Sequence, residues 1–284
     1  MTPILKATGL GMIYGGQFVA LRDLDIEIQP HERVAVIGRS GAGKSTMLRI
    51  FNRLLHPTSG TLELDGTDIT HAQGRQLRLV RRRVGMVFQQ FNLVSRLSVL
   101  DNVLVGTLGK RHGLALLPSL WRQFSAQDRE WAMHCLSEVG IEHLATKRAT
   151  ELSGGQQQRV AIARLLAQEA DVILADEPIA SLDPRSAEQV MSILRMINET
   201  HGVAVITNLH QVDVATKFAE RIVGLRDGAM VMDTTSDQLN EELLEMLYGD
   251  QLDEAQSKSQ SATIKGEIES QGSLNHADVF QAMV

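Results

Sequence analysis

Cysteine, long apolar runs and excess positive charge are all scarce in this sequence. The 284 residues include one cysteine, Cys135, so an internal disulfide and a disulfide-held secreted fold are excluded. No uninterrupted apolar run approaches the roughly 18 residues of a membrane-spanning helix, and the N-terminus has no signal-peptide pattern. With 28 Lys and Arg against 34 Asp and Glu, the formal net charge of −6 argues against a general nucleic-acid binder. These absences predict a soluble cytoplasmic protein.

The negative charge is concentrated at the C-terminal end. Residues 233–284 carry 11 acidic and 2 basic side chains, whereas the rest of the chain is mildly basic. The last part, residues 249–284, is also rich in Ser and Gln, and we expect it to be a loosely ordered acidic tail. Whether this tail regulates the protein is left open.

Short apolar segments alternate with helical patterns along the body of the chain. Val34–Ile37 and Val172–Ala175 are continuous apolar runs, which are typical of strands buried on both faces of a parallel sheet. A mainly helical region is expected at about residues 92–155. Further helices are predicted at residues 45–55, 156–168 and 185–200. The alternation predicts an α/β fold with a buried parallel sheet.

The loop after the first of these strands has the pattern GxxxxGK[ST] of a phosphate-binding loop. Its glycines allow backbone N–H groups to surround phosphates, and the helix that follows points its positive end at them. Lys44 is expected to reach the β- and γ-phosphates, and the Ser45 hydroxyl suits Mg²⁺. The predicted nucleotide-binding residues are Gly38, Arg39, Ser40, Gly41, Ala42, Gly43, Lys44, Ser45 and Thr46.

A second apolar strand ends in two adjacent acids, Asp176 and Glu177. Such a strand places them at the carboxyl edge of the sheet, where ligands bind in open α/β folds. We assign Asp176 to the Mg²⁺ site and Glu177 to the water that attacks the nucleotide.

Between the loop and the acids lies Leu152-Ser-Gly-Gly-Gln-Gln-Gln-Arg159. Alone, it predicts a helix start capped by Ser153, with exposed backbone N–H groups that form an anion-binding surface. LSGGQ resembles the signature of ATP-binding cassette (ABC) ATPases, and the order of the three motifs is theirs. The resemblance implies a head-to-tail homodimer, in which the signature of one subunit contacts the γ-phosphate held by the other. The residues implied are Ser153, Gly154, Gly155 and Gln156.

The resemblance covers residues 4–248 and implies a fold. It is a P-loop NTPase fold, an ABC nucleotide-binding domain with a mainly parallel core sheet, an antiparallel β subdomain and a helical subdomain at about residues 92–155.

Other positions carry over from the family one by one. Tyr14 matches the aromatic residue that stacks on adenine. Gln89 matches the glutamine that touches Mg²⁺ and the attacking water, with Gln90 as the alternative if the register shifts by one. Asp183 matches the carboxylate of the segment that crosses the dimer interface, and His210 matches the histidine that contacts the γ-phosphate.

Several segments are more similar to one branch, the phosphonate-import ATPases. They are Phe88-Gln-Gln-Phe-Asn-Leu-Val94, Asp176-Glu-Pro-Ile-Ala-Ser-Leu-Asp183, Leu209-His-Gln-Val-Asp213 and an apolar insertion at residues 113–124. This resemblance implies an ATP-hydrolysing subunit of a bacterial phosphonate importer, peripheral at the cytoplasmic face of the inner membrane. Its implied partners are transmembrane permease subunits and, indirectly, a periplasmic substrate-binding protein. Phosphite, another oxyanion or polar amino acids are the alternative substrates.

ABC ATPases that act in DNA repair or translation are a remote alternative. Only 107 residues separate Ser45 from Ser153, too few for the long coiled coil of the repair type, and a single cassette is present. A kinase would have no use for the signature. Cys135 lies in a helical pattern and is interpreted as part of the core, and the apolar residues 114–124 either dock a membrane partner or pack in the helical subdomain.

Overall fold

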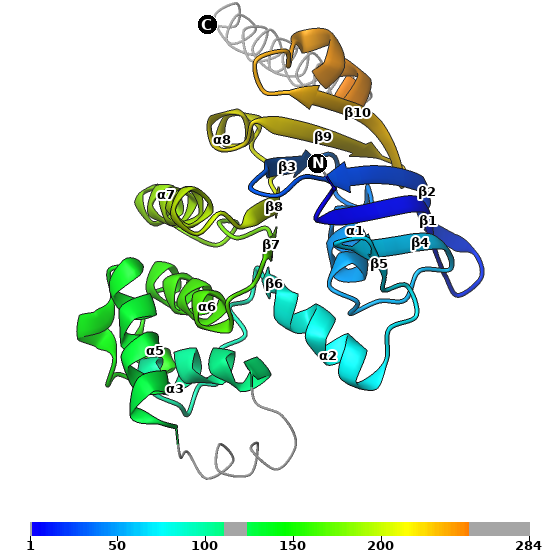
Figure 1. Cartoon of the computed structure of the whole chain (residues 1–284). Helices are drawn as coiled ribbons and strands as arrows, with labels where there is room; N and C mark the ends of the chain where they lie inside the picture. Colours follow the sequence, from blue (N-terminus) through cyan, green and yellow to red (C-terminus); the bar gives the residue numbers. More distant parts are fainter. Residues whose placement is uncertain (1, 111–123, 250–284) are drawn as a thin grey trace, which may run out of the picture. The chain divides into compact units, whose positions relative to one another are not determined.

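The computed structural model describes residues 2–110 and 124–249 and divides the chain into two compact units, residues 1–239 and 240–284. In the second unit, residues 241–249 are helical. Most of the apolar insertion and the acidic tail from residue 250 onward lie outside the described residues. Figure 1 shows the sheets and helices of the first unit.

A six-stranded sheet forms the centre of the first unit, in the order β10-β9-β3-β8-β7-β6. All neighbouring pairs are parallel except β9 with β10. The strands are β3 (Arg33–Ile37), β6 (Val84–Val87), β7 (Val172–Asp176), β8 (Ala204–Asn208), β9 (Arg221–Arg226) and β10 (Ala229–Thr235). Every residue of β7 and β8 is buried, and for β7 the continuous apolar run Val172–Ala175 predicted this.

A second, antiparallel sheet has the order β2-β1-β4-β5. Its strands are β1 (Leu5–Tyr14), β2 (Phe18–Ile28), β4 (Ser59–Leu64) and β5 (Thr67–Asp68). Alternate residues of β2 from Leu24 to Ile28 are buried, which is the pattern of a strand with one face on the core. The mainly parallel sheet and the antiparallel sheet confirm the predicted fold class.

The helices flank the central sheet. They are α1 (Lys44–Phe51), α2 (Gly74–Arg83), α3 (Val99–Leu104), α5 (Ala126–Glu138), α6 (Gly154–Gln168), α7 (Pro184–His201) and α8 (Val212–Phe218), with short 3₁₀ helices at Val105–Lys110, Glu142–Leu144 and Ala149–Glu151. The predicted helix over residues 45–55 was too long. It ends at Phe51 because Arg53 has a left-handed backbone, φ 57°, and the Asn52 side chain bonds the carbonyl of Val84.

Helices α3, α5 and α6 pack on one another and lie apart from the antiparallel sheet in Figure 1. Cys135 is buried on α5, in agreement with its predicted place in the core. Of these helices, α3 and α5 lie within residues 92–155, the region predicted to be a helical subdomain, whereas α6 extends beyond it. The limits assigned to that subdomain stay a prediction.

Arg221 at the start of β9 ties several segments together. Its guanidinium bonds both oxygens of Asp233 at 2.6 Å, Glu32 Oε1 at 3.0 Å and the carbonyl of Glu27 at 2.8 Å. These bonds join β9 to β10, to the end of β2 and to the connection between β2 and β3. Bidentate charge-assisted bonds of this kind are stronger than bonds between neutral groups.

We expect Arg221→Met to lower the free energy of unfolding by about 2 kcal/mol, because it leaves Glu32 and Asp233 without their shared cation. Urea denaturation measures the effect. Lys6→Met is the control, because Lys6 pairs with Glu27 on an exposed surface. Equal midpoints for the two variants would contradict the assigned role of Arg221.

Candidate active site

The phosphate-binding loop joins β3 to α1, and two of its glycines are required by their surroundings. Gly38 has φ 145°, and a methyl group there would lie 2.2 Å from the carbonyl oxygen of Leu225. Gly43 has φ 101°, and its methyl group would lie 2.5 Å from the carbonyl oxygen of Ala20. The loop is thus pressed between β2 and β9, where a side chain has neither the conformation nor the room.

Lys44 opens α1 and turns its ammonium group back into the loop. Its Nζ atom donates to the carbonyl oxygens of Gly38 at 2.7 Å and Arg39 at 2.9 Å. The residue is buried, and burial lowers the pKa of Lys44, while the nearby Glu177 and Asp176 carboxylates oppose this shift. The loop therefore holds a buried cation beside its own backbone.

Asp176, the last residue of β7, receives hydrogen bonds from two other segments. Ser45 Oγ and Asn208 Nδ2 each lie 2.7 Å from Asp176 Oδ1. Arg49, on α1, lies 3.8 Å from the other carboxylate oxygen, Oδ2. The structure thus brings together Ser45 and Asp176, two of the three residues that the sequence analysis assigned to the same metal.

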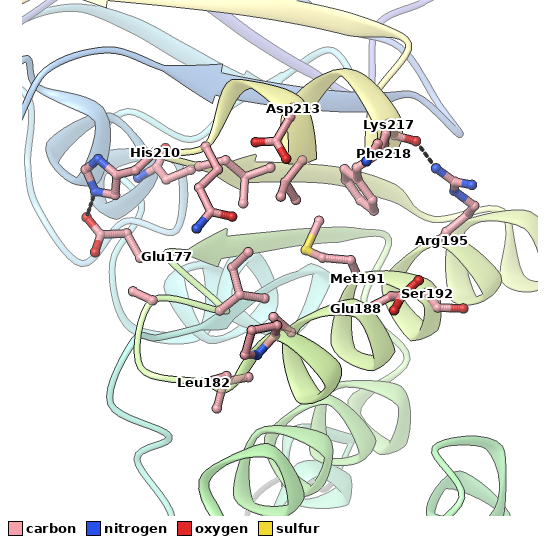
Figure 2. A pocket seen from close by; sticks show the side chains of 18 residues that line it. Glu177, Leu182, Glu188, Met191, Ser192, Arg195, His210, Asp213, Lys217 and Phe218 are labelled. Carbon is pink, nitrogen blue, oxygen red and sulfur yellow. Dashed lines mark hydrogen bonds and ion pairs between the residues drawn. The ribbon is translucent and has the colours of Figure 1, made fainter.

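Glu177 and His210 form a pair at the carboxyl edge of the sheet, and Figure 2 shows the two side chains pointing toward each other. His210 Nε2 lies 2.7 Å from Glu177 Oε1. Glu177 has a left-handed backbone, φ 53°, which is strained for a residue other than glycine and is often found at functional sites. The pairing brings together two residues that the sequence analysis assigned to the same reaction.

A groove of about 900 Å³ begins at this pair and runs between α7 and α8. Figure 2 shows Glu177 and His210 at one end, and Arg195 and Lys217 at the other. Arg195 donates to the backbone carbonyl of Lys217 and closes that end. Apolar side chains that line the groove include Leu182, Met191 and Phe218.

The signature residues begin α6. Ser153 caps the helix in a capping box: its Oγ accepts from the N–H of Gln156, and the Gln156 side chain accepts from the N–H of Ser153. A methyl group at Gly155 would lie 2.7 Å from the Ser186 side chain, at the start of α7. The signature therefore packs closely on the segment that follows the acidic strand.

Asp183 caps α7, and its carboxylate accepts the backbone N–H of Ser186 at 3.0 Å. Hydrogen bonds from the Ser186 side chain and backbone lower the pKa of Asp183. The predicted interface carboxylate therefore has a structural role within its own chain as well.

Two other predicted residues lie on the surface. Tyr14 ends β1 and stacks on Phe18, with ring centroids 6.5 Å apart. Gln89 and Gln90 are exposed on the segment after β6, next to β7 in the sheet. Within the described residues, no hydrogen bond joins Gln89 to Ser45 or Asp176, so its expected metal contact stays a prediction.

Known proteins share this combination of fold and motifs. The ABC transporter family matches residues 21–180. The chain belongs to the ABC transporter family.

Its relatives include the phosphonates import ATP-binding protein PhnC 2 of Halalkalibacterium halodurans, 46% identical over 245 residues that cover 86% of this chain and 99% of the relative. PhnC of Agrobacterium fabrum is 50% identical over 234 residues, 82% of this chain and 81% of that protein. A solved dimeric ATP-binding cassette, MJ0796, bound to ADP and phosphate, matches with a TM-score of 0.72 and 36% identity over 82% of this chain and 98% of its own.

As a member of this family, the chain is an ATP-binding, ATP-hydrolysing subunit of a transport system and works with membrane permease subunits. Within residues 2–110 and 124–249, no helix of this ABC protein is long and apolar enough to cross a bilayer.

Sequence reasoning missed three side chains of this ABC site. Asn208 and Arg49 contact Asp176, and Gln158 Nε2 donates to the carbonyl of Pro178 at 2.7 Å. Asn208 and Gln158 are fully buried amides. A polar residue in a strand or helix face that is otherwise apolar was the available signal.

The oxygen atoms of this ABC site suit magnesium. Ser45 Oγ and Asp176 Oδ1 are hard donors only 2.7 Å apart, and the Asp176 side chain is almost fully buried. A carboxylate and a hydroxyl are the protein ligands expected for Mg²⁺ beside nucleotide phosphates. The residues present therefore fit the ion.

The two glycines at positions 41 and 43 allow a matched test of the phosphate loop. Both have positive φ, but a methyl group at Gly41 would meet nothing within 4 Å. We expect Gly41→Ala to cost about 1 kcal/mol of backbone strain, and Gly43→Ala to cost about 3 kcal/mol because it also clashes with Ala20. Denaturation without nucleotide compares them, and equal losses would refute the packing described for Gly43.

Proposed function

We propose that this chain drives the import of phosphonates across a bacterial inner membrane by hydrolysing Mg²⁺-ATP between two copies of itself. The observation that carries the chemistry is the Glu177–His210 pair beside the loop that holds Lys44. The relatives named as phosphonate importers support the substrate class. The ATPase itself need not contact the phosphonate.

The phosphate groups of ATP bind at the start of α1. There the backbone N–H groups of the loop and the positive end of the helix face the nucleotide. The Lys44 ammonium exchanges its two carbonyl partners for phosphate oxygens, and Tyr14 offers an exposed ring for adenine. Burial of Lys44 strengthens this interaction, because charges attract more strongly where water is excluded.

Glu177 acts as the general base. Its carboxylate accepts a proton from, or orients, the water that attacks the γ-phosphate in line. His210 holds this carboxylate through the 2.7 Å hydrogen bond, and with Lys44 it stabilises the charge that develops on the phosphoryl oxygens.

Ser45, Asp176 and Gln89 are the residues that would hold magnesium. When bound, the ion neutralises phosphate charge and aligns the leaving group.

A second copy supplies what one chain lacks. Ser153, Gly154, Gly155 and Gln156 of each copy contact the γ-phosphate bound by the other, and Asp183 lies at this interface. The dimeric form of the related cassette MJ0796 supports this arrangement. Hydrolysis removes the bridging phosphoryl group, so the two copies separate and the attached permease changes conformation.

The assembly proposed contains two ATPase copies, transmembrane permease subunits and, on the far side of the membrane, a substrate-binding protein. The chain lies on the cytoplasmic face as a peripheral subunit. Residues 4–248 form the ATP-binding domain, with a helical subdomain at about 92–155 and an acidic tail after it. Phosphite, another oxyanion or polar amino acids are the alternative cargoes.

Glu177→Gln should retain ATP binding but slow hydrolysis by at least about 100-fold, because the amide cannot accept the proton. It should also accumulate as an ATP-bound dimer. Single-turnover hydrolysis and size-exclusion chromatography measure the two effects. Glu188→Gln is the control, because Glu188 lies on the wall of the same groove on α7. Hydrolysis by Glu177→Gln at close to the wild-type rate would rule out this base.

Transport is tested in cells that lack the chain but express its permease and binding protein. We expect uptake of a labelled alkylphosphonate to return with the wild-type chain and not with Glu177→Gln. Failure of the wild type to restore uptake would reject phosphonate as the cargo, and the same cells would then be tested with labelled phosphite and amino acids.

A further inference from the structure

Asn208 ends β8, one of the two central strands of the six-stranded sheet. Its Cα pairs in register with Asp176 on β7 and with Val36 on β3, the strand that leads into the phosphate-binding loop. The remaining residues of β8, Ala204 to Thr207, are fully buried or nearly so. Asn208 is thus a buried amide placed between the acidic strand end and the phosphate loop.

One end of the Asn208 side-chain amide is hydrogen-bonded and the other is not. Nδ2 donates to Asp176 Oδ1 at 2.7 Å, whereas Oδ1 is buried and has no hydrogen-bond partner among the described residues. The reverse orientation would place two acceptors against each other, so the carboxylate fixes which atom faces Asp176.

A purely structural role accounts poorly for this side chain. A buried acceptor without a partner costs free energy, and an apolar residue of similar size would leave nothing unsatisfied in the strand. What the asparagine supplies, and valine does not, is an N–H directed at Asp176.

We propose that Asn208 is a positioning residue for the magnesium site, and that its N–H holds the Asp176 carboxylate in a fixed orientation when the metal binds. This inference rests on the proposed function. In the structure, Asp176 Oδ1 accepts hydrogen bonds from both Ser45 Oγ and Asn208 Nδ2. If the Ser45 oxygen binds the ion, that hydroxyl is shared between the metal and Asp176, whereas the Asn208 amide donates to Asp176 alone.

Arg49 does not take over this role. Its guanidinium lies 3.8 Å from Asp176 Oδ2, beyond hydrogen-bond distance, and half of its side chain is exposed. An exposed arginine at this separation contributes charge but does little to fix the orientation of a carboxylate.

The test measures ATP affinity with and without magnesium by calorimetry, so the readout is binding and not turnover. For Asn208→Val, we expect metal-free ATP affinity to stay within about twofold of wild type. The gain in affinity that magnesium gives should fall by about tenfold or more, the range seen when a group that orients a metal ligand is removed. Mn²⁺ binding to the ATP complex, followed by electron paramagnetic resonance, should weaken in parallel.

Thr207→Val is the matched control, because it places the same residue one position earlier on β8. Thr207 is equally buried, and its hydroxyl bonds the carbonyl of Ala175 at 3.4 Å, not a carboxylate. Asn208→Ala repeats the test with a smaller side chain in case the valine variant does not fold.

Loss of the magnesium effect in either folded Asn208 variant, with Thr207→Val unchanged, would support the inference. An unchanged magnesium effect in a folded Asn208 variant, or an equal loss in Thr207→Val, would overturn it. A wild-type chain that does not bind ATP at all would instead refute the proposed function, so the two failures are distinguishable.

Discussion

Two hydrogen bonds of 2.7 Å converge on Oδ1 of Asp176, one from Ser45 and one from Asn208. They connect the ends of β7 and β8 to the first turn of α1, three segments that are far apart in the sequence. A carboxylate this buried is costly unless it is paired or hydrogen-bonded. The parallel sheet makes the arrangement possible, because it brings the carboxyl ends of neighbouring strands to one edge. The Ser45 bond ties the phosphate loop to this edge of the sheet, and Glu177, the residue after Asp176, lies there too.

Much of this architecture could be predicted from local chemistry. The apolar runs before Gly38 and Asp176 identified two strands of the parallel sheet. Strands that are buried on both faces are apolar at nearly every position, whereas strands with one exposed face alternate apolar and polar residues. Ser153 before two glycines predicted the capped start of α6. Lys44 and Ser45 were assigned from the spacing of the phosphate-loop pattern, and Asp176 from its place at the end of a buried apolar strand. The structure brings these three residues together.

The rest depended on contacts between distant segments. Nothing near Asn208 or Gln158 in the sequence indicates that one amide meets Asp176 and the other the Pro178 carbonyl, 32 and 20 residues away. The end of α1 was missed for a similar reason. Asn52 follows the last residue of α1, and its side chain donates to the carbonyl of Val84 on β6. This tertiary contact overrides helix propensity.

The contacts of α6 indicate how the signature and the proposed base act together. Gln158 holds the Pro178 carbonyl, one residue after the strained Glu177, and Gly155 packs without spare room against Ser186 at the start of α7. A shift of α6 would therefore be passed on to the segment that carries Glu177, because close-packed interiors transmit strain. If a second copy presses on the signature, the same contact reaches the base of the first copy's own site. Such coupling would make the rate of hydrolysis depend on the presence of both copies.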